Sequence, residues 1–200
     1  MSFLYPPRPE KAIMPDMLRM MEMEGFSAEI KKNGTCSVLE YNEGHLDAWT
    51  RHNELHKAWK PDMATPCLRK LGLLNGKNVL VGELLHSKGN GHTDTMYLFD
   101  ILIHEGKNLI GLTLAERRQI LHTLWEFKGE TYSHYIVDDR LWVAKPYVSG
   151  FRELFDGIVN PEDEGLVLKN PQAKLQPCFK NGLNAGWQVK CRKATKNYSF

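Results

Sequence analysis

The last part of the sequence lacks acidic residues. No Asp or Glu follows Glu164, whereas seven Lys and Arg residues do, so the first 164 residues carry a net charge of −5 and the last 36 carry +7. A positive segment of this kind attracts phosphate, whether of a nucleotide or of a nucleic acid. A basic solvated tail is the alternative. The apolar stretches GLVLK and GWQVKC inside the segment favour a folded, phosphate-facing surface instead.

Cysteine is scarce, and long apolar runs are missing. The four cysteines lie far apart without a CxxC pair, which argues against a disulfide-dense secreted domain and favours a reduced intracellular protein. No window approaches 18 uninterrupted apolar residues, and MSFLYPPRPE has no basic region followed by an apolar one. We therefore expect a cytoplasmic protein that does not enter a membrane.

Apolar residues are nevertheless plentiful enough for a core. They make up 42% of the 200 residues, and 10% of the residues are aromatic. No internal repeat or low-complexity linker divides the chain. We therefore expect one domain over residues 1–200, in which residues 1–26 form an extended arm and a short helix around PDMLRMMEME.

The pattern of apolar residues changes to a period of two from residue 27 on. SAEIKKNGTCSVLEYNEGHLDAWTR predicts strands separated by turns, and KNVLVGELLHSK and TDTMYLFDILIHEGKN are apolar runs typical of buried strands. GLTLAERRQILHTLWEFK predicts a helix that Thr113 caps and in which Glu116 completes a capping box. A further strand, a second helix and two final strands follow. These elements indicate an α+β fold of twisted antiparallel sheets flanked by helices.

Short stretches in a fixed order from Glu29 to Lys193 resemble the adenylation domain of ATP-dependent polynucleotide ligases, in the covalent nucleotidyltransferase superfamily. They are KKNG at 31–34, TRHN at 50–53, VGEL at 81–84, YLFDIL at 97–102, EGLVLK at 164–169 and WQVKCRK at 187–193. EGLVLK and YLFDIL are the most specific members. The resemblance implies an ATP-grasp-like nucleotidyltransferase fold and ATP as the cofactor.

A lysine that attacks the α-phosphate of ATP must first lose its proton, although the free side chain has a pKa of about 10.4. Neighbouring cations and partial burial lower that pKa, so several cations should converge on one site. The resemblance makes Lys31 the nucleophile that forms lysyl-AMP, with Glu29 and Ile30 beside the nucleotide. Asn33-Gly34 can supply the positive φ angles of a tight turn. Lys32 would point to the opposite face of the strand, into solvent.

Glu83 and Glu164 stand beside apolar strand residues, where an unpaired carboxylate is costly. The resemblance gives Glu83 the ribose hydroxyl, and it gives Glu164, with Glu83, a divalent metal. Mg²⁺ (or Mn²⁺) is expected because it prefers hard oxygen ligands and phosphates. Salt bridges to Arg51 or to a lysine are the alternative. Phe99 would stack on the adenine unless it is an ordinary core residue, and Asp100 would pair with a basic residue.

Three cations near the end of the sequence could neutralise the α-phosphate while pyrophosphate leaves. They are Lys169, Lys190 and Arg192, and the last two share one face of a strand because they are two residues apart. Family members usually have lysines two and four residues after the tryptophan of the last motif, so Lys193 stays an alternative to Lys190 and Arg192. Arg51 would grip a phosphate or the substrate strand.

We therefore expect an enzyme that seals 5′-phosphate/3′-hydroxyl nicks in duplex nucleic acid, as a monomeric ATP-dependent DNA ligase or RNA ligase. DNA is slightly preferred because YLFDILIHEGKNLIGLTLAERR resembles DNA ligases, whereas Cys36 stands where many of them have arginine. An RNA-repair enzyme and a non-catalytic nucleic-acid-binding module of the same fold stay open. Since the sequence ends soon after WQVKCRK, we expect no C-terminal oligonucleotide-binding domain.

Overall fold

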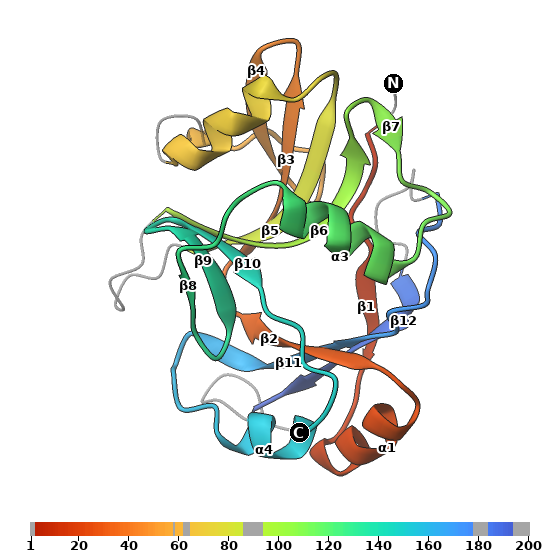
Figure 1. Cartoon of the computed structure of the whole chain (residues 1–200). Coiled ribbons are helices and arrows are strands. Elements are labelled where there is room, and N and C mark those ends of the chain that lie inside the picture. The colour runs from red at the N-terminus through yellow and green to blue at the C-terminus, as the bar shows by residue number, and fades with distance from the viewer. Residues whose placement is uncertain (1–2, 58, 62–64, 86–93, 178–183, 194–200) are drawn as a thin grey trace.

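Two stacked β-sheets build the molecule (Figure 1). The computed structural model describes residues 3–57, 59–61, 65–85, 94–177 and 184–193. The smaller sheet has the order β1-β12-β11-β2, and the larger has the order β4-β3-β5-β6-β10-β9-β8, with β7 paired to β6. Most neighbouring strands are antiparallel, whereas β1 with β12 and β6 with β10 are parallel. The predicted α+β class of mainly antiparallel sheets is confirmed.

The strands are short and the helices are few in the described part of the chain. The smaller sheet contains β1 (Arg8–Ala12), β2 (Ser27–Lys32), β11 (Asp163–Lys169) and β12 (Asn184–Arg192). The larger contains β3 (Thr35–Asn42), β4 (His45–Thr50), β5 (Asn78–Leu85), β6 (Thr95–His104), β7 (Lys107–Asn108), β8 (Gly129–Glu130), β9 (His134–Asp138) and β10 (Leu141–Ala144). The helices are η1 (Pro15–Met17), α1 (Leu18–Met23), η2 (Pro66–Leu73), α3 (Leu114–Thr123) and α4 (Phe151–Asp156).

Helices α1 and α4 cover the outer face of the smaller sheet (Figure 1). Leu18 of α1 and Phe151 of α4 are fully buried and pack in one apolar cluster with Ile30, Leu166 and Val189 of the sheet. Because side chains alternate along a strand, the neighbours of these apolar residues project from the other face. That other face therefore carries the charged residues of β2, β11 and β12.

The N-terminal segment is a strand of the smaller sheet and not a free arm. Residues 8–12 form β1, which pairs in parallel with β12, and the backbone N–H of Ile13 donates to the carbonyl of Lys190 at 2.9 Å. The short helix predicted after it is present as η1 and α1. The strand was missed because its alternation is weak and its proline-rich surroundings favour an extended arm.

Helix α3 packs against β6 of the larger sheet (Figure 1). Its predicted capping box is present, with Thr113 as the cap and Glu116 as the reciprocal partner. Arg117 in its first turns is fully buried and makes two hydrogen bonds of 2.9 Å to the carboxylate of Asp100 on β6. The predicted pairing of Asp100 with a basic residue is thereby confirmed.

The predicted Asn33-Gly34 turn has a different physical basis in the structure. It joins β2 of the smaller sheet to β3 of the larger sheet, so it is no hairpin, and neither residue has a positive φ angle. Glycine is required here by a close approach, because a Cβ at Gly34 would lie 2.4 Å from the carbonyl oxygen of Leu84 and 2.9 Å from Cγ of Glu83. The prediction of positive φ angles at this turn was wrong.

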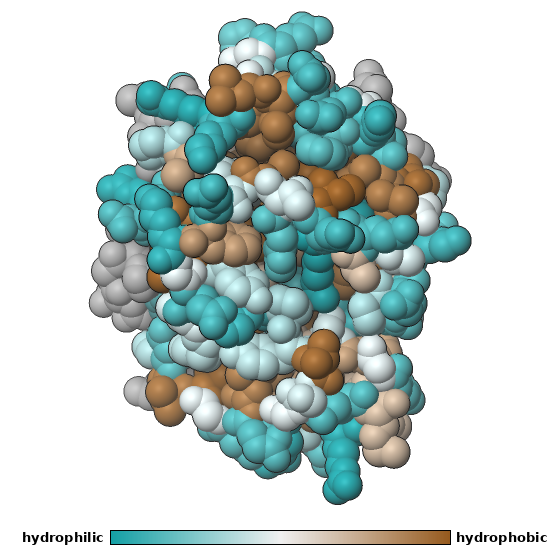
Figure 2. Space-filling model, in the orientation of Figure 1, coloured by the Kyte–Doolittle hydropathy of each residue, from teal (hydrophilic) through white to brown (hydrophobic). Residues whose placement is uncertain are grey.

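The surface seen in Figure 2 carries hydrophobic residues in separate groups between hydrophilic ones. Within the part of the chain that the structure describes, we find no helix that is long and apolar enough to cross a membrane.

Candidate active site

A cleft between the two sheets holds the predicted site residues. Its volume is about 650 Å³, which lies in the range of small-molecule sites. The smaller sheet forms its floor, and β3, β5 and β6 form a wall. The predicted residues that line it are Glu29, Ile30, Lys31, Arg51, Glu83, Phe99, Glu164, Lys169, Lys190 and Arg192. The structure thus brings all of them to one cavity, while the role of each stays a prediction.

The register of the smaller sheet arranges the floor in three cross-strand rows. Read from β2 through β11 to β12, the rows are Lys31–Gly165–Arg192, Glu29–Val167–Lys190 and Ser27–Lys169–Gln188. Successive rows are two residues apart, or about 7 Å along the strands. Lys31 and Lys169 therefore stand about 13 Å apart along the sheet. We call Lys31, Glu164, Lys190 and Arg192 the open end of the cleft, and Glu29, Lys169 and Arg118 the buried end.

The open end is a partly exposed cluster of charges. Lys31 Nζ forms an ion pair with Glu164, whose other cationic neighbour is Arg192 at 3.6 Å. The side chains of Lys31 and Glu164 are 18% and 23% exposed. Burial lowers the pKa of Lys190 below its ordinary value, and the positive charges of Arg192 and Lys31 lower it further. The predicted convergence of cations around Lys31 is therefore present for Lys190 and Arg192.

A β-bulge brings Glu164 to the cleft. The pairing of β11 with β2 shifts between Asp163 and Gly165, so Glu164 lies outside the regular alternation. Gly165 has a φ of +135°, and a Cβ there would lie 2.1 Å from the carbonyl oxygen of Cys191. Only glycine can occupy this position without moving β12, which explains the glycine of EGLVLK in physical terms.

The last motif has the register of Lys190 and Arg192 and not of Lys193. Lys190 and Arg192 line the cleft, whereas Lys193 Nζ donates to the carbonyls of Asp156 and Ile158 at 3.1 and 2.6 Å. Those carbonyls lie at the end of α4, outside the cleft lining. Lys193 therefore caps a helix end, where cations are favourable.

Glu83 and Cys36 form the wall above the open end. The two residues are cross-strand partners on β5 and β3. Burial raises the pKa of Glu83 to about 7, against the opposing positive charge of Lys31. The negative charge of Glu164 adds to the rise, so the two carboxylates act on each other across the cleft. A carboxylate pair of this kind is where a cation or a hydroxyl donor would be favourable.

The buried end is an ion-pair network that joins the smaller sheet to helix α3. Lys169 Nζ donates to Glu29 Oε2 at 2.6 Å, and Arg118 of α3 pairs with Glu29 Oε1 and donates to Ser27 Oγ at 2.8 Å. Burial alone raises the pKa of Glu29, but the positive charges of Lys169 and Arg118 outweigh it and hold the pKa below its ordinary value. Lys169 Nζ also lies 4.6 Å from the ring centre of Phe99. Lys169 is therefore beside Phe99 and not beside Lys31.

Sequence reasoning missed Arg118. Its side chain is 11% exposed and reaches from α3 across to the smaller sheet. The carboxylate of Glu29 on a buried strand needs a basic partner, but no sequence spacing connects residue 118 with residue 29. The burial of Arg117 could be predicted more easily from the sequence. Arg117 lies three residues after Leu114 and four before Leu121, on the apolar face of the helix.

Ile30 and Arg51 contribute in different ways. The carbonyl of Ile30 accepts a hydrogen bond of 3.1 Å from the Tyr97 hydroxyl, and its side chain is buried in the core below the floor. Arg51 is exposed at the rim, just after β4, and its Nε lies 3.2 Å from Nε2 of His52. Ile30 can therefore reach a ligand in the cleft only through its backbone, whereas Arg51 has a side chain that is able to turn inward.

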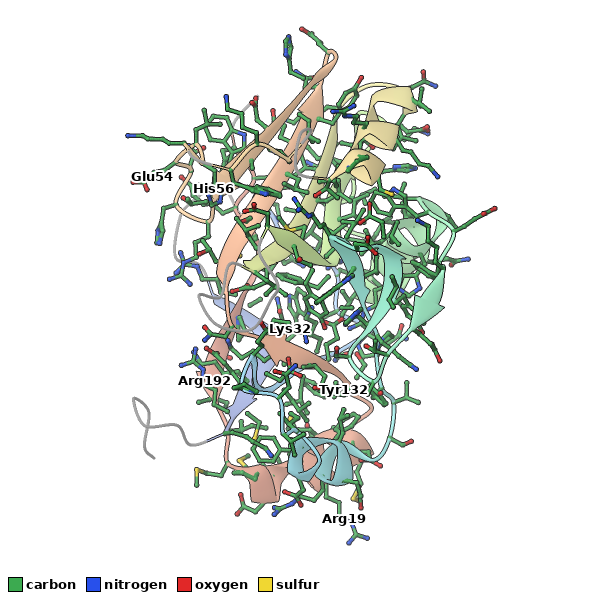
Figure 3. All side chains as sticks on the ribbon, turned by 90° about the vertical axis from the view of Figure 1, so that its left-hand side faces the viewer. Arg19, Lys32, Glu54, His56, Tyr132 and Arg192 are labelled. Carbon is green, nitrogen blue, oxygen red and sulfur yellow. The ribbon has the colours of Figure 1, made fainter. Side chains whose placement is uncertain are left out.

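Lys32 is not the solvated lysine that the sequence suggested. Its side chain is 3% exposed, and its Nζ lies 2.7 Å from Oδ1 of Asp163, which is fully buried. Figure 3 shows Lys32 inside the molecule, whereas Arg19 and Glu54 lie at its periphery. The prediction failed because β2 ends where the two sheets meet, so both directions from this strand lead into protein.

The carboxylates of the open end fit a divalent cation only together with a further ligand. Among residues 3–57, 59–61, 65–85, 94–177 and 184–193, no group of three or more His, Cys, Asp or Glu side chains could hold a metal ion. Glu83 and Glu164 supply hard oxygen atoms, which suit Mg²⁺ and Mn²⁺. Phosphate oxygens of a nucleotide would have to complete such a site.

Comparison with known proteins adds independent evidence. The family model described as an ATP dependent DNA ligase domain matches residues 89–187. DNA ligase 3 of Dictyostelium discoideum is 27% identical over 199 residues, which cover 84% of this chain and 16% of that protein. The DNA ligase of Cenarchaeum symbiosum (strain A) is 23% identical over 195 residues, which cover 86% of this chain and 31% of that protein. The chain thus spans less than a third of the length of these relatives.

Solved structures share the fold. The ligase domain of M. tuberculosis LigD superposes with a TM-score of 0.68 at 19% identity, covering 94% of this chain and 59% of that one. Mycobacterial DNA ligase D complexed with ATP and MES has a TM-score of 0.65 at 19% identity, covering 94% of this chain and 60% of that one. A Naegleria gruberi RNA ligase mutant with AMP and Mn has a TM-score of 0.52 at 16% identity, covering 94% of this chain and 57% of that one. With the ordered motifs in one cleft, the family model and the curated relatives identify the chain as similar to the ATP-dependent DNA ligases, and the solved structures show that it has the fold of their ligase domains.

Proposed function

We propose that this chain is the catalytic core of an ATP-dependent polynucleotide ligase and that Lys31 takes AMP from ATP. The observation that carries the proposal is the position of the Lys31 amine, which meets Glu164 at the open end of a nucleotide-sized cleft, beside Lys190 and Arg192. Nicked duplex DNA is the proposed substrate, because the curated relatives are named DNA ligases.

In the first step Lys31 Nζ attacks the α-phosphorus of ATP. The P–N bond forms, the bond from the α-phosphorus to the bridging oxygen breaks, and pyrophosphate leaves. The proton that Lys31 loses passes to solvent, which reaches the partly exposed pair of Lys31 and Glu164. Lys190 and Arg192 offset the negative charge that moves from the α-phosphoryl oxygens to the leaving group.

The remaining residues of the cleft bind and orient the nucleotide. Phe99 offers a ring for stacking on the adenine, and Lys169 beside it serves the base rather than the α-phosphate, since it stands about 13 Å along the sheet from Lys31. Glu83 faces the ribose. Glu164 and Glu83 would hold a Mg²⁺ ion together with phosphate oxygens, and the ion would supply further positive charge to the phosphates.

Two nucleic-acid steps complete the proposed reaction. AMP passes from Lys31 to the 5′-phosphate at a nick, which breaks the P–N bond and forms a phosphoanhydride. The 3′-hydroxyl then attacks that 5′-phosphate, forms the phosphodiester bond and releases AMP. Arg51, exposed at the rim of the cleft, is placed to contact a strand phosphate.

Incubation with α-labelled ATP and Mg²⁺ tests the proposal. Label should stay on the denatured protein, should vanish in Lys31→Ala and should persist in Lys11→Ala, which removes an exposed lysine of β1 that does not line the cleft. Labelling by GTP in place of ATP would instead indicate guanylyl transfer of the capping type. Binding of a nicked duplex without any adduct would indicate a non-catalytic module, and sealing of nicked RNA but not DNA would indicate an RNA ligase.

A further inference from the structure

A second ion pair lies directly beside the one in the cleft. Lys32 and Asp163 are the chain neighbours of Lys31 and Glu164, so two adjacent lysines on β2 meet two adjacent carboxylates on β11. The side chains of Lys32 and Asp163 are 3% and 0% exposed, against 18% and 23% for Lys31 and Glu164. The two pairs thus have the same chemistry in very different surroundings.

The buried pair is held from the larger sheet. The Tyr132 hydroxyl donates to Oδ2 of Asp163, and Lys32 Nζ lies 5.9 Å and 5.8 Å from the ring centres of Tyr97 and Trp142. Cations are attracted to aromatic ring faces at such distances. These contacts give Lys32 a socket that Lys31 does not have. In the view of Figure 3, Lys32 lies between Arg192 and Tyr132.

A gain in stability does not by itself account for this buried pair. Replacing a buried ion pair by apolar side chains of similar volume is often neutral or stabilising, because desolvation offsets the attraction between the charges. Register offers a better reason. A slip of one residue between paired strands exchanges the faces of every side chain, and here the slipped arrangement would still match lysines with carboxylates. Only the socket distinguishes Lys32 from Lys31.

We propose that Lys32 and Asp163 form a positioning pair that fixes the register of β2 against β11 and so sets Lys31 against Glu164 at the open end of the cleft. The proposal rests on the proposed function, in which Lys31 is the nucleophile. Lys32 and Asp163 touch neither ATP nor the reacting atoms. Their effect reaches the reaction only through the placement of their neighbours, where a displacement of about 1 Å can cost about 100-fold in rate.

The test replaces both charges at once. Lys32→Met with Asp163→Leu removes both charges and leaves no unpaired ion. The midpoint of thermal unfolding should therefore fall much less than when one partner alone is removed, while kcat for labelling (the rate constant at saturating ATP) should fall about tenfold or more and KM should change less than about twofold. The matched control is Lys77→Met with Glu40→Leu, a pair at 2.7 Å that does not line the cleft and should leave labelling unchanged. A folded double variant whose kcat stays within about twofold of wild type overturns the proposal.

A second measurement needs no ATP and separates this inference from the proposed function. Reductive methylation of the unliganded protein, mapped by mass spectrometry, reports how firmly Glu164 holds Lys31. Lys31 should be methylated at least about threefold faster in the double variant, relative to the exposed Lys11 in the same molecule. Equal rates overturn the inference, whether or not the wild type forms an adduct. If the double variant does not fold, Asp163→Asn replaces it, since it keeps the shape and the hydrogen bond from Tyr132. Its unfolding midpoint should fall because Lys32 loses its counter-charge, while labelling and methylation should change as in the double variant.

Discussion

The two ends of the cleft contain the same types of charged residue, but these side chains are paired and buried to different degrees. At the open end, Lys31 and Glu164 pair with side chains about one-fifth exposed, and Arg192 stands 3.6 Å away. At the buried end, Glu29 has both carboxylate oxygens occupied, by Lys169 and by Arg118, and its side chain is 3% exposed. The charged side chains of the open end can therefore change partners at a low cost in free energy, whereas those of the buried end cannot.

This difference matches the demands of the proposed reaction. A nucleophile must leave its resting partner to reach phosphorus, and partly solvated pairs are weak enough to allow that. A base-binding surface must keep one shape, and a buried network of charges resists rearrangement because each unpaired member is costly.

The largest effect should come from removing one carboxylate charge at each end. Glu29→Gln leaves the cations of Lys169 and Arg118 without their counter-charge, and it should lower the free energy of unfolding by about 3–5 kcal/mol. Glu164→Gln breaks a partly exposed pair and should cost about 1 kcal/mol or less. Urea unfolding measures both. Equal losses for the two variants would contradict the distinction between the ends.

Removing a cation from the open end should affect the rate and not the stability. Lys190→Met should slow labelling by ATP about 100-fold, because a preorganised positive charge near the phosphates is lost. The matched control is Lys193→Met, three residues further along the chain. It removes contacts to two carbonyls outside the cleft and should leave the labelling rate unchanged. An equal fall in the labelling rates of the two variants would contradict a role specific to Lys190.

The pH dependence of stability should show that Glu29 at the buried end is ionised. Because Lys169 and Arg118 hold the pKa of Glu29 below its ordinary value of 4.5, ionised Glu29 contributes stability above pH 4.5 that is lost as the pH falls through its lower folded value. The stability gap between wild type and Glu29→Gln should therefore narrow on acidification below pH 4.5. Urea midpoints at a series of pH values measure it. A gap that widens at low pH would refute the assignment of Glu29 as an ionised member of the network.

The smallest effect is expected at Phe99. Phe99→Leu should raise KM for ATP about tenfold and leave kcat unchanged, since stacking of a base on an aromatic ring contributes about 1–3 kcal/mol. Phe127→Leu is the matched control, because Phe127 stacks on Tyr135 away from the cleft lining. The single-turnover rate of labelling, measured at varied ATP, separates the two parameters. An unchanged KM for Phe99→Leu would leave Phe99 as an ordinary core residue.

Much of the fold followed from local pattern. The helix with Thr113 and Glu116, the strands on either side of it and the pairing of Asp100 depend on short-range periodicity or on the cost of an unpaired charge. The ten cleft residues, by contrast, could be named because the ordered motifs resemble those of ATP-dependent polynucleotide ligases. Their assignment to roles at the two ends needed the cross-strand register, which no periodicity contains.

Adjacent residues of like charge were the least predictable feature. Lys31 and Lys32 pair with different carboxylates, and Arg117 and Arg118 serve different sheets. Alternation along a strand says that neighbours diverge, but it does not say what each one meets. The prediction of a hairpin turn at Asn33-Gly34 failed for the same reason. Asn-Gly is a hairpin signal within one sheet, whereas here it connects two sheets whose separation is set by tertiary packing.

The parallel pairing of β1 with β12 also has a consequence for biosynthesis. Residues 8–12 are translated long before their partners, residues 184–192. Such distant partners delay closure, because a long loop must be ordered before the contact rewards it. The smaller sheet, and with it the alignment of Lys190 beside Lys31, should therefore form only after residues 184–192 have left the ribosome, and a shorter nascent chain should lack a competent cleft.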